Sequence, residues 1–380
     1  GRTMKIVYCV HSVYNPGGME RVLLNKVTYL SQHTDWEILI VTTDQKGRPA
    51  FYPFPDTVRM IDLDINYSDD NNGPVWTKVL GYLKRKRAHK KRLTRLLYQE
   101  KPDFVVSLYP SESSFIPDIK DGSKKILELH YCKFFRLQYG RQGILGLIDK
   151  WRTRTDERLV RRFDRFVVLT QEDRQYWGDL PNIQVIPNAA MRLKNVYADP
   201  SVKRVLAVGR LDYQKGFDKL IQAWKLVKED SELSDWKLDI FGQGEWKDKL
   251  LNEIKEYGLE DSLEIHAPTT DIGQEYVSSS ILVMSSNYEG FPMVMIEAMA
   301  CGVPVVSFAF KCGPKDIIRH QENGLIVPEG DIVALAKALS FMMKDNALRA
   351  YCSQNAREII AEYSEEVIMK KWMDLFIQMK

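Results

Sequence analysis

Short apolar, β-branched segments alternate with longer amphipathic stretches along the whole chain, and this alternation constrains the fold more than any other feature. The ten segments with strand character are "KIVYCV", "EILIVTT", "DFVVSL", "KKILEL", "RFVVLT", "RVLAVG", "KLDIFG", "SLEIHA", "SILVMS" and "VPVVSF". Stretches with helical spacing, such as Phe217–Lys228 and Trp246–Tyr257, lie between them. Strands and helices that alternate in this way form parallel sheets with helices on both faces. The chain is therefore predicted to be an α/β protein.

The ten segments divide into two series of five, which predicts two Rossmann-like domains. A chain of 380 residues is also too long for one compact core. The alternation lapses at 187–203, where Pro187 and Pro200 disfavour helix. We therefore place the first domain at 1–190 and the second at 200–360. Open parallel sheets bind ligands beyond the carboxyl ends of their strands, so we expect the site in a central cleft that the two domains face.

Charge is distributed unevenly between the two domains. Residues 1–190 hold 31 Lys and Arg against 22 Asp and Glu, whereas the remainder holds 23 against 29. A basic first half and an acidic second half suggest that the two domains have different partners.

Cysteine usage and hydropathy favour a cytoplasmic chain. The five cysteines are scattered and form no CxxC pair, which favours reduced thiols over a disulfide framework or a zinc site. No apolar run reaches the roughly 18 residues that a spanning helix needs. The first apolar run, "MKIVYCV", is too short for a signal peptide.

The stretch "EGFPMVMIE" at 289–297 places two glutamates around an apolar run. Glutamate is rarely buried without a partner, so Glu297 in this run requires an explanation. Glu289 falls in the loop after a predicted strand, and Glu297 falls in the following helix. Each carboxylate could accept hydrogen bonds from the hydroxyls of one long ligand. The pattern fits equally well a core helix with an incidental glutamate at each end.

The helix after Glu289 is predicted to start at Pro292 and to run to about Ala300, because proline is well tolerated in a first turn. The free N–H groups of Met293 and Val294 would then point out of the helix N-terminus. Such N–H groups attract anions, phosphate among them.

Two further strand-to-helix turns carry features of phosphate binding. In "RVLAVGRLDYQKGFDKLI" a strand is followed by Gly209, Arg210 and Lys215, and cations at this position suit a diphosphate. In "HSVYNPGGMERVLLN" the glycine pair Gly17 and Gly18 precedes a helix and permits close approach of the backbone to a ligand. On its own, the first segment is better explained as a solvated loop before an amphipathic helix, and any tight strand-to-helix turn could look like the second.

Neither glycine turn has the spacing of a known nucleotide fingerprint. The turn with Gly17 and Gly18 lacks both GxGxxG and GxxxxGK[ST]. The segment "FGQGEW" at 241–246, which contains Gly242, has no third glycine.

Taken together, these segments resemble the retaining nucleotide-sugar glycosyltransferases of family 4, which have the two-domain GT-B fold. "EGFPMVMIEAMACGVPVVSF" is similar to the Glu-x7-Glu signature of that family. Four more segments resemble family elements in the same order along the chain: "NPGGMERVL", "AVGRLDYQKGFDKLI", "LDIFGQGE" and "ENGLIVPEGD". The resemblance covers most of the chain. It also implies that the amphipathic segment 361–380 is a helix that crosses back to the first domain.

The resemblance implies a role for each matching residue. Arg210 and Lys215 would hold the donor diphosphate, Glu289 the hydroxyls of the donor sugar and Glu297 those of the ribose. His130, at the end of "KKILELH", matches the active-site histidine of the family; without that context it would be read as a core histidine. The remaining expected donor contacts are Gly17, Gly18, Gly209, Gly242, Gly290, Phe291, Pro292, Met293 and Val294.

The resemblance also implies the chemistry. Negative charge grows on the departing diphosphate, where two cations and helix N-termini would stabilise it. No cofactor or metal is expected, and Asp62 and Asp64 of "DLD" are interpreted as surface residues. "VIPNAA" and "IHAPTTD" depart from the usual family sequences, which leaves the donor base open.

A basic segment in the first half suggests where the acceptor resides. Lys78 to Arg95 contains nine basic residues and no acid, with Trp76, Tyr82, Leu83 and Leu93 interleaved. This pattern is typical of a basic amphipathic helix that lies on an anionic membrane, and the segment 133–154 has a similar mixture. A solvated basic helix is the alternative. Nucleic acid is not expected as a partner, given the donor-site segments.

The sequence thus predicts a bacterial glycosyltransferase for capsule, exopolysaccharide or lipopolysaccharide synthesis. The expected donor is a nucleotide sugar, with UDP as the nucleotide of choice, and the expected acceptor is a saccharide, lipid-linked and met at the inner face of the membrane. A sugar-nucleotide 2-epimerase of the same fold and an inactive nucleotide-sugar-binding protein are the alternatives.

Overall fold

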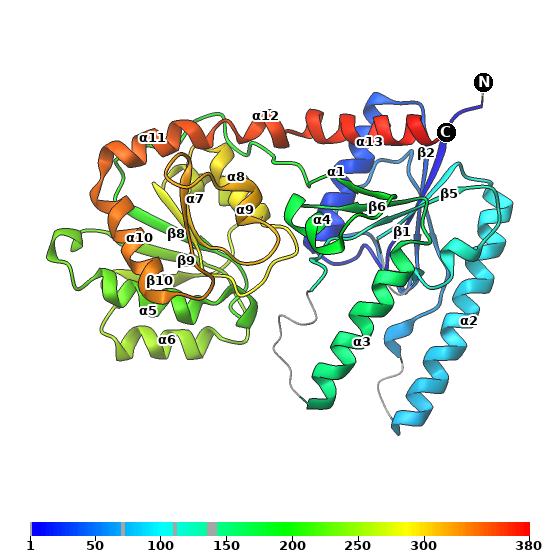
Figure 1. Cartoon of the computed structure of the whole chain (residues 1–380), viewed down its shortest axis with the longest axis horizontal. Helices are drawn as coiled ribbons and strands as arrows, with labels where there is room; N and C mark the ends of the chain where they lie inside the picture. Colours follow the sequence, from blue (N-terminus) through cyan, green and yellow to red (C-terminus); the bar gives the residue numbers. More distant parts are fainter. Residues whose placement is uncertain (1, 70–72, 109–111, 135–142) are drawn as a thin grey trace.

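The computed structural model describes residues 2–69, 73–108, 112–134 and 143–380. Two parallel sheets lie side by side, each flanked by helices, as Figure 1 shows. The first is a 7-stranded sheet of order β3-β2-β1-β4-β5-β6-β7, and the second is a 6-stranded sheet of order β10-β9-β8-β11-β12-β13. The predicted two-domain α/β architecture is confirmed.

The first domain contains seven strands and four α-helices among the described residues. Its strands are β1 Lys5–Cys9, β2 Glu37–Thr42, β3 Arg59–Asp62, β4 Phe104–Ser107, β5 Lys124–Glu128, β6 Arg165–Val168 and β7 Ile183–Val185. Its helices are α1 Gly18–His33, α2 Val75–Glu100, α3 Gly143–Val160 and α4 Gln171–Trp177.

The second domain follows with β8 and ends before the helices that return to the first. Its strands are β8 Arg204–Val208, β9 Lys237–Phe241, β10 Leu263–His266, β11 Ile281–Met284, β12 Val305–Phe308 and β13 Gly324–Val327. Its helices are α5 Phe217–Val227, α6 Lys247–Glu256, α7 Ile272–Val277, α8 Met293–Ala300, α9 Pro314–Ile317, α10 Ile332–Lys344 and α11 Asn346–Ala356.

All ten predicted strands are present, and the three strands outside that set, β3, β7 and β13, all lie at sheet edges. β3 and β7 are the outer strands of the first sheet. Neither contains a fully buried residue, so neither has the apolar run that identifies an interior strand.

Each of the five inner strands of the first sheet supplies apolar side chains to both of its faces. In β1, Ile6 and Tyr8 belong to one core cluster, whereas Val7 and Cys9 belong to the cluster on the opposite face. This division follows from the two-residue period of a strand. It explains why the strands are read as continuous apolar runs.

The end of the chain returns to the first domain. α12 Ile359–Tyr363 and α13 Glu365–Met379 run from the second domain across to the first (Figure 1). The buried face of α13, which includes Trp372 and Phe376, packs in the same cluster as Ile6 and Tyr8. The C-terminal helix therefore ties the two domains together through apolar burial.

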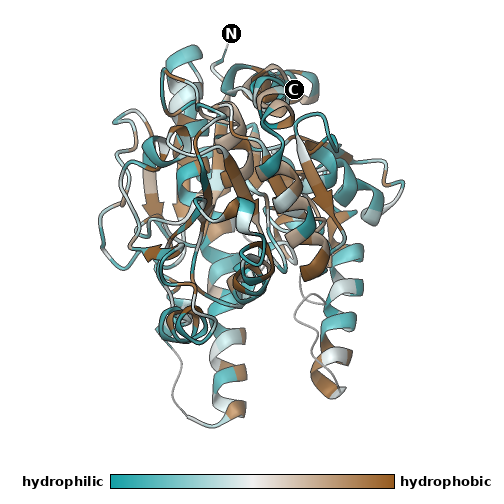
Figure 2. Ribbon diagram, turned by 90° about the vertical axis from the view of Figure 1, so that its left-hand side faces the viewer, coloured by the Kyte–Doolittle hydropathy of each residue, from teal (hydrophilic) through white to brown (hydrophobic). Residues whose placement is uncertain are grey.

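Two helices of the first domain extend beyond its body. The buried residues of α2 are His89, Leu93, Leu96 and Leu97, all in its second half. Figures 1 and 2 show the other half of α2 and the start of α3 projecting on the same side of the domain. In the described residues, no helix has both the length and the apolar character needed to cross a membrane.

Candidate active site

The strand order of the second sheet brings two of the predicted segments together. β8 and β11 are adjacent, and the connections from β8 to β9 and from β11 to β12 lead in opposite directions across the sheet. Ligands of open parallel sheets bind where the strand order reverses in this way. The loops after β8 and β11, which carry Lys215 and Glu289, therefore meet at this point.

Lys215 and Glu289 form a shielded ion pair at this point. The Lys215 Nζ atom donates to Glu289 Oε1 at 2.6 Å, and both side chains are largely withdrawn from solvent. Ser286 Oγ also donates to Glu289 Oε1 at 2.8 Å, and Gln214 Nε2 donates to Oε2 at 3.4 Å. The carboxylate is thus held by three groups of the second domain.

Arg210 stands further out than Lys215 in the same loop. Its side chain is 70% exposed, and Nε lies 3.4 Å from Asp212 Oδ2. Its Nη2 donates to Gln214 Oε1 at 2.8 Å. Gln214 thus connects Arg210 to Glu289, and Arg210 keeps the exposure that binding an incoming anion requires.

Two of the predicted glycines lie where a side chain would collide with backbone. A Cβ atom on Gly242 would lie 1.8 Å from the carbonyl oxygen of Gly209. A Cβ atom on Gly290 would lie 2.2 Å from the carbonyl oxygen of His130, which belongs to the other domain. Gly290 therefore marks a close contact of the two domains beside Glu289.

The start of α8 differs from the prediction. The helix begins at Met293, with Pro292 as the N-cap residue. The prediction that the Met293 N–H is free was wrong, because it donates to the carbonyl oxygen of Phe291 at 2.9 Å. Phe291 and Pro292 are buried, so the loop folds back on itself before the helix starts. Of the two backbone N–H groups proposed to bind phosphate, that of Val294 remains the candidate.

Glu297 has a partner that the sequence did not reveal. The hydroxyl of Tyr276, in α7, donates to Glu297 Oε2 at 3.0 Å. Burial raises the pKa of Glu297, although the Tyr276 hydrogen bond and the Arg21 guanidinium of α1 oppose this effect. A carboxylate in this apolar run is therefore accommodated by a buried tyrosine and by a cation from the first domain.

The first domain contributes a glycine turn and a histidine. Gly17 is the N-cap of α1, which begins at Gly18. His130 follows β5, and its Nε2 lies 3.2 Å from Glu128 Oε1. Glu128 also forms an ion pair with Lys26 of α1, and both partners are buried. Burial alone would raise the pKa of Glu128, but Lys26 and His130 lower it to about 2.

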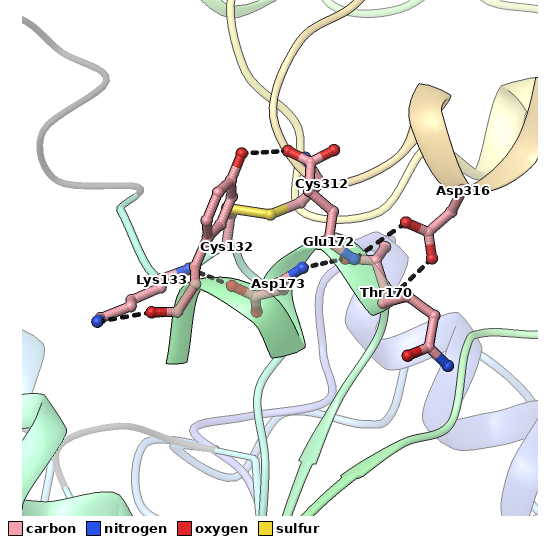
Figure 3. Close-up of a disulfide and its surroundings, with 9 residues drawn as sticks. Cys132, Lys133, Thr170, Glu172, Asp173, Cys312 and Asp316 are labelled. Carbon is pink, nitrogen blue, oxygen red and sulfur yellow. Dashed lines mark hydrogen bonds between the residues drawn. A yellow bond between two sulfur atoms is a disulfide. The ribbon is translucent and has the colours of Figure 1, made fainter. Parts of the chain in front are cut away.

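The expectation that all cysteines are reduced was wrong. Cys132 and Cys312 form a disulfide, with their Cα atoms 5.9 Å apart and a sequence separation of 180 (Figure 3). One cysteine follows β5 and the other follows β12, so the bond joins the two domains. Spacing along the chain could not reveal this pairing, because it depends on how the domains meet. The cysteines therefore no longer support a cytoplasmic location.

Hydrogen bonds reinforce this junction (Figure 3). The carboxylate of Asp316, in α9, accepts the backbone N–H groups of Gln171 at 2.6 Å and Glu172 at 3.1 Å. In return, Glu172 Oε2 accepts the backbone N–H of Cys312 at 3.1 Å. Each domain therefore supplies a carboxylate to backbone amides of the other.

Asp173, beside the disulfide, predicts a pH dependence of stability. Burial raises its pKa to about 7, against the opposing hydrogen bond from the backbone N–H of Lys133. An unfolded aspartate titrates near pH 4, so the folded chain retains a proton that the unfolded chain has lost. The free energy of unfolding should therefore fall as the pH rises from about 4 to about 7, by at most about 4 kcal/mol.

Asp173→Asn should remove most of this fall, as measured by denaturant unfolding at pH 5 and at pH 8. The exposed Asp179→Asn variant in the same region is the control and should keep the wild-type pH profile. An unchanged profile for Asp173→Asn would show that Asp173 is ionised throughout this range.

Two groups of side chains in the described residues have the composition of a metal site. The first consists of Cys132, Asp173 and Cys312, and its two sulfur atoms are already joined to each other. The second consists of Asp239, Glu264 and His266, in which Asp239 is paired with Arg204 at 2.7 Å and with His266 at 2.8 Å. We assign a metal to neither, and metal independence stays a prediction.

Several residues of the site escaped the sequence analysis. Gln214 lies inside a segment that was singled out and Ser286 directly follows the strand segment "SILVMS", so their position close to Lys215 and Glu289 was a usable signal. Tyr276, Lys26 and Glu128 gave no such signal. They reach the site through the packing of α7, α1 and β5.

Comparison with known proteins gives matches over both domains. Residues 16–190 match the model of Glycosyltransferase Family 4, and residues 194–359 match that of Glycosyl transferases group 1. Amylovoran biosynthesis glycosyltransferase AmsD of Erwinia amylovora is 30% identical over 98% of this chain and 99% of its own length. An α-1,4-N-acetyl-D-galactosaminyltransferase of Campylobacter jejuni, whose named acceptor is a diphosphate-undecaprenol-linked saccharide, is 24% identical over 99% of each chain.

A solved structure shows the same fold. Alr3699/HepE of Anabaena, in complex with UDP and glucose, superposes with a TM-score of 0.73 at 18% identity. The match covers 99% of this chain and 100% of that one.

Proposed function

Because this chain belongs to the family 4 glycosyltransferases of the GT-B fold, we propose that it is a retaining, metal-independent hexosyltransferase. Its donor is a nucleotide diphosphate sugar, with UDP as the nucleotide and a hexose or N-acetylhexosamine as the sugar. Its acceptor is a lipid-linked saccharide of a cell-surface polysaccharide. The observation that carries the proposal is the Lys215–Glu289 pair at the reversal point of the second sheet, next to Gly290, whose backbone lies close to the carbonyl of His130.

In this proposal the two cations act on the leaving diphosphate. Arg210 is exposed and able to engage the anion as it enters, and Lys215 is held in place by Glu289. As the sugar–phosphate bond breaks, negative charge grows on the diphosphate. Fixed cations stabilise that charge better than water does, because they need no reorganisation.

The two glutamates bind the ends of the donor. Glu289, already fixed by Ser286, accepts hydroxyls of the sugar. Glu297, fixed by Tyr276, accepts those of the ribose. No protein nucleophile is assigned; the acceptor hydroxyl passes its proton to a phosphate oxygen as the new glycosidic bond forms. His130 lies on the acceptor side, next to the sugar.

The acceptor is proposed from the relatives. The Campylobacter relative is named for an undecaprenol-linked acceptor, and the Erwinia relative for amylovoran biosynthesis. A lipid-linked acceptor places the enzyme at the inner face of the cytoplasmic membrane.

The test is a panel of nucleotide sugars, each incubated with and without a polyprenyl-diphosphate saccharide, with release of nucleoside diphosphate as the readout. We expect one UDP-sugar to give release only with acceptor, an α-linked product by NMR, and an unchanged rate in EDTA. Consumption of donor without acceptor would instead indicate the 2-epimerase, and binding of donor without any turnover would indicate the inactive protein. A β-linked product would contradict retention.

A further inference from the structure

The free half of α2 exposes an unusual number of large apolar side chains. Trp76 is 66% exposed, and none of the first 14 residues of the helix is fully buried. The exposed apolar side chains in this part are Val75, Trp76, Val79, Leu80, Tyr82 and Leu83. Exposed apolar patches of this kind mark surfaces that contact a protein or a membrane.

The beginning of α3 has the same character. Its exposed apolar side chains are Ile144, Leu145, Leu147, Ile148 and Trp151, and Trp151 is 66% exposed. The two helices project from the same side of the first domain in both Figure 1 and Figure 2. Figure 2 shows hydrophobic residues at both free ends. The two apolar ends can therefore meet one flat surface together.

Charge follows the apolar residues in the same order on both helices. In α2 the turns after Leu83 carry Lys84, Arg87 and Lys91, all exposed, and no acid occurs before Glu100. In α3 the apolar start is followed by exposed Lys150, Arg152 and Arg154. Apart from the exposed Lys78 within the apolar end of α2, each helix thus has an apolar end and then a basic belt nearer the body of the domain.

We propose that these two helix ends dock the protein, tip first, on an anionic lipid bilayer. The apolar part of α2, nine residues long, spans on the order of 13 Å, enough to reach below the headgroups, where interfacial segments bury to a depth of about 5–10 Å. The basic belts then lie at the level of the lipid phosphates and attract them. A helix lying flat on the surface, as the sequence pattern suggested, would bury its second half, which is occupied by packing in the domain.

This docking rests on the proposed function only in its purpose, which is to bring a lipid-linked acceptor to the cleft. α3 follows in the chain the segment that carries His130 and Cys132, and that segment contacts the second domain. The test below therefore measures lipid binding separately from glycosyl transfer.

The experiment is co-sedimentation of the full chain with vesicles of phosphatidylglycerol and phosphatidylcholine, compared with phosphatidylcholine alone. The tip variants are Trp76→Ser with Leu80→Ser, and Ile148→Ser with Trp151→Ser. The matched control is Val333→Ser with Phe341→Ser, which removes exposed apolar residues from α10 of the second domain.

We expect wild type and the control to bind anionic vesicles alike. Each tip variant should lower the partition constant by about tenfold or more, because apolar area leaves the bilayer. Exchange of Lys84, Arg87 and Lys91 for glutamine should lower the partition constant by a similar factor at low salt. Raising the salt concentration should then weaken the binding of this variant little further, because its contact with the lipid charges is already lost. Brominated lipids should quench wild-type tryptophan fluorescence, and a variant with Trp76→Phe and Trp151→Phe should lose that quenching.

Three results would overturn the proposal: no binding to anionic vesicles, equal binding to neutral ones, or equal losses in the control variant. Binding that the basic exchange abolishes and the tip variants leave intact would replace insertion by purely electrostatic contact, and would overturn the tip-first geometry. If vesicle binding holds while no donor is turned over, the proposed function fails and the docking surface stands.

Discussion

Exchange of Lys215 for alanine is expected to lower kcat by about 10²–10³-fold, the range found when one preorganised donor to a developing negative charge is removed. Lys215 Nζ lies 2.6 Å from Glu289 Oε1 at the point where the strand order reverses. The charge that it stabilises appears on the diphosphate as the bond breaks. The donor KM should change much less than kcat.

Arginine should not restore the rate. The stem of Lys215 lies against Gly209, and its Nζ atom is 2.6 Å from Glu289 Oε1, so the longer and planar guanidinium would not place its charge at the same point. Lys219→Ala is the matched control, since Lys219 is a nearby lysine that donates to Asn287 Oδ1 at 2.6 Å and does not touch Glu289.

Loss of folding must be separated from loss of chemistry. Glu289 keeps Ser286 and Gln214 as hydrogen-bond donors in the Lys215→Ala variant, so thermal unfolding should shift only modestly. A rate within threefold of wild type, or a fall shared by Lys219→Ala, would show that Lys215 is not the group that stabilises the leaving diphosphate.

The structural features that depend on neighbouring residues were predicted correctly from the sequence. The ten apolar strands, the turns that carry Lys215 and Glu289 and the start of α8 near Pro292 all follow from local pattern. The edge strand β3 was missed for the same reason, because partial exposure leaves it no apolar run. Local pattern also fixes which loops end at the carboxyl edge of a sheet, and so the general position of the site.

Contacts between segments that are distant in the sequence could not be predicted from local pattern. The Cys132–Cys312 bond depends on the docking of two separately folded sheets. Tyr276 reaches Glu297 because α7 packs beside α8, which no spacing rule contains. The free end of α2 is a further case: its composition indicated an amphipathic helix, but only the packing of its second half shows which part remains uncovered.

The buried Lys26–Glu128 pair should give the largest stability effect of any single exchange in the first domain. Lys26 Nζ lies 4.1 Å from the centroid of the Trp372 ring in α13, and Glu128 faces His130. Glu128→Gln leaves the Lys26 charge buried without a counter-charge. The free energy of unfolding at pH 7 should therefore fall by about 3–5 kcal/mol, as should that of Lys26→Met.

The double variant distinguishes an ion pair from two independent packing losses. With both charges removed, no unpaired charge remains buried, so Lys26→Met with Glu128→Gln should lose clearly less than the two single losses combined. Lys370→Met is the control, because its pair with Asp374 is exposed and should contribute less than about 1 kcal/mol. Additive losses would mean that the two charges do not stabilise each other.

Acid unfolding gives an independent test of the same pair. Because Lys26 and His130 lower the pKa of Glu128 to about 2, its stabilising effect is complete above about pH 4.5 and is lost as the pH falls toward 2. Wild type should therefore lose stability steeply across this window, and Glu128→Gln should lose less there. If both lose stability with the same slope, Glu128 is not ionised in the folded chain, and the site would have to orient His130 without a buried carboxylate.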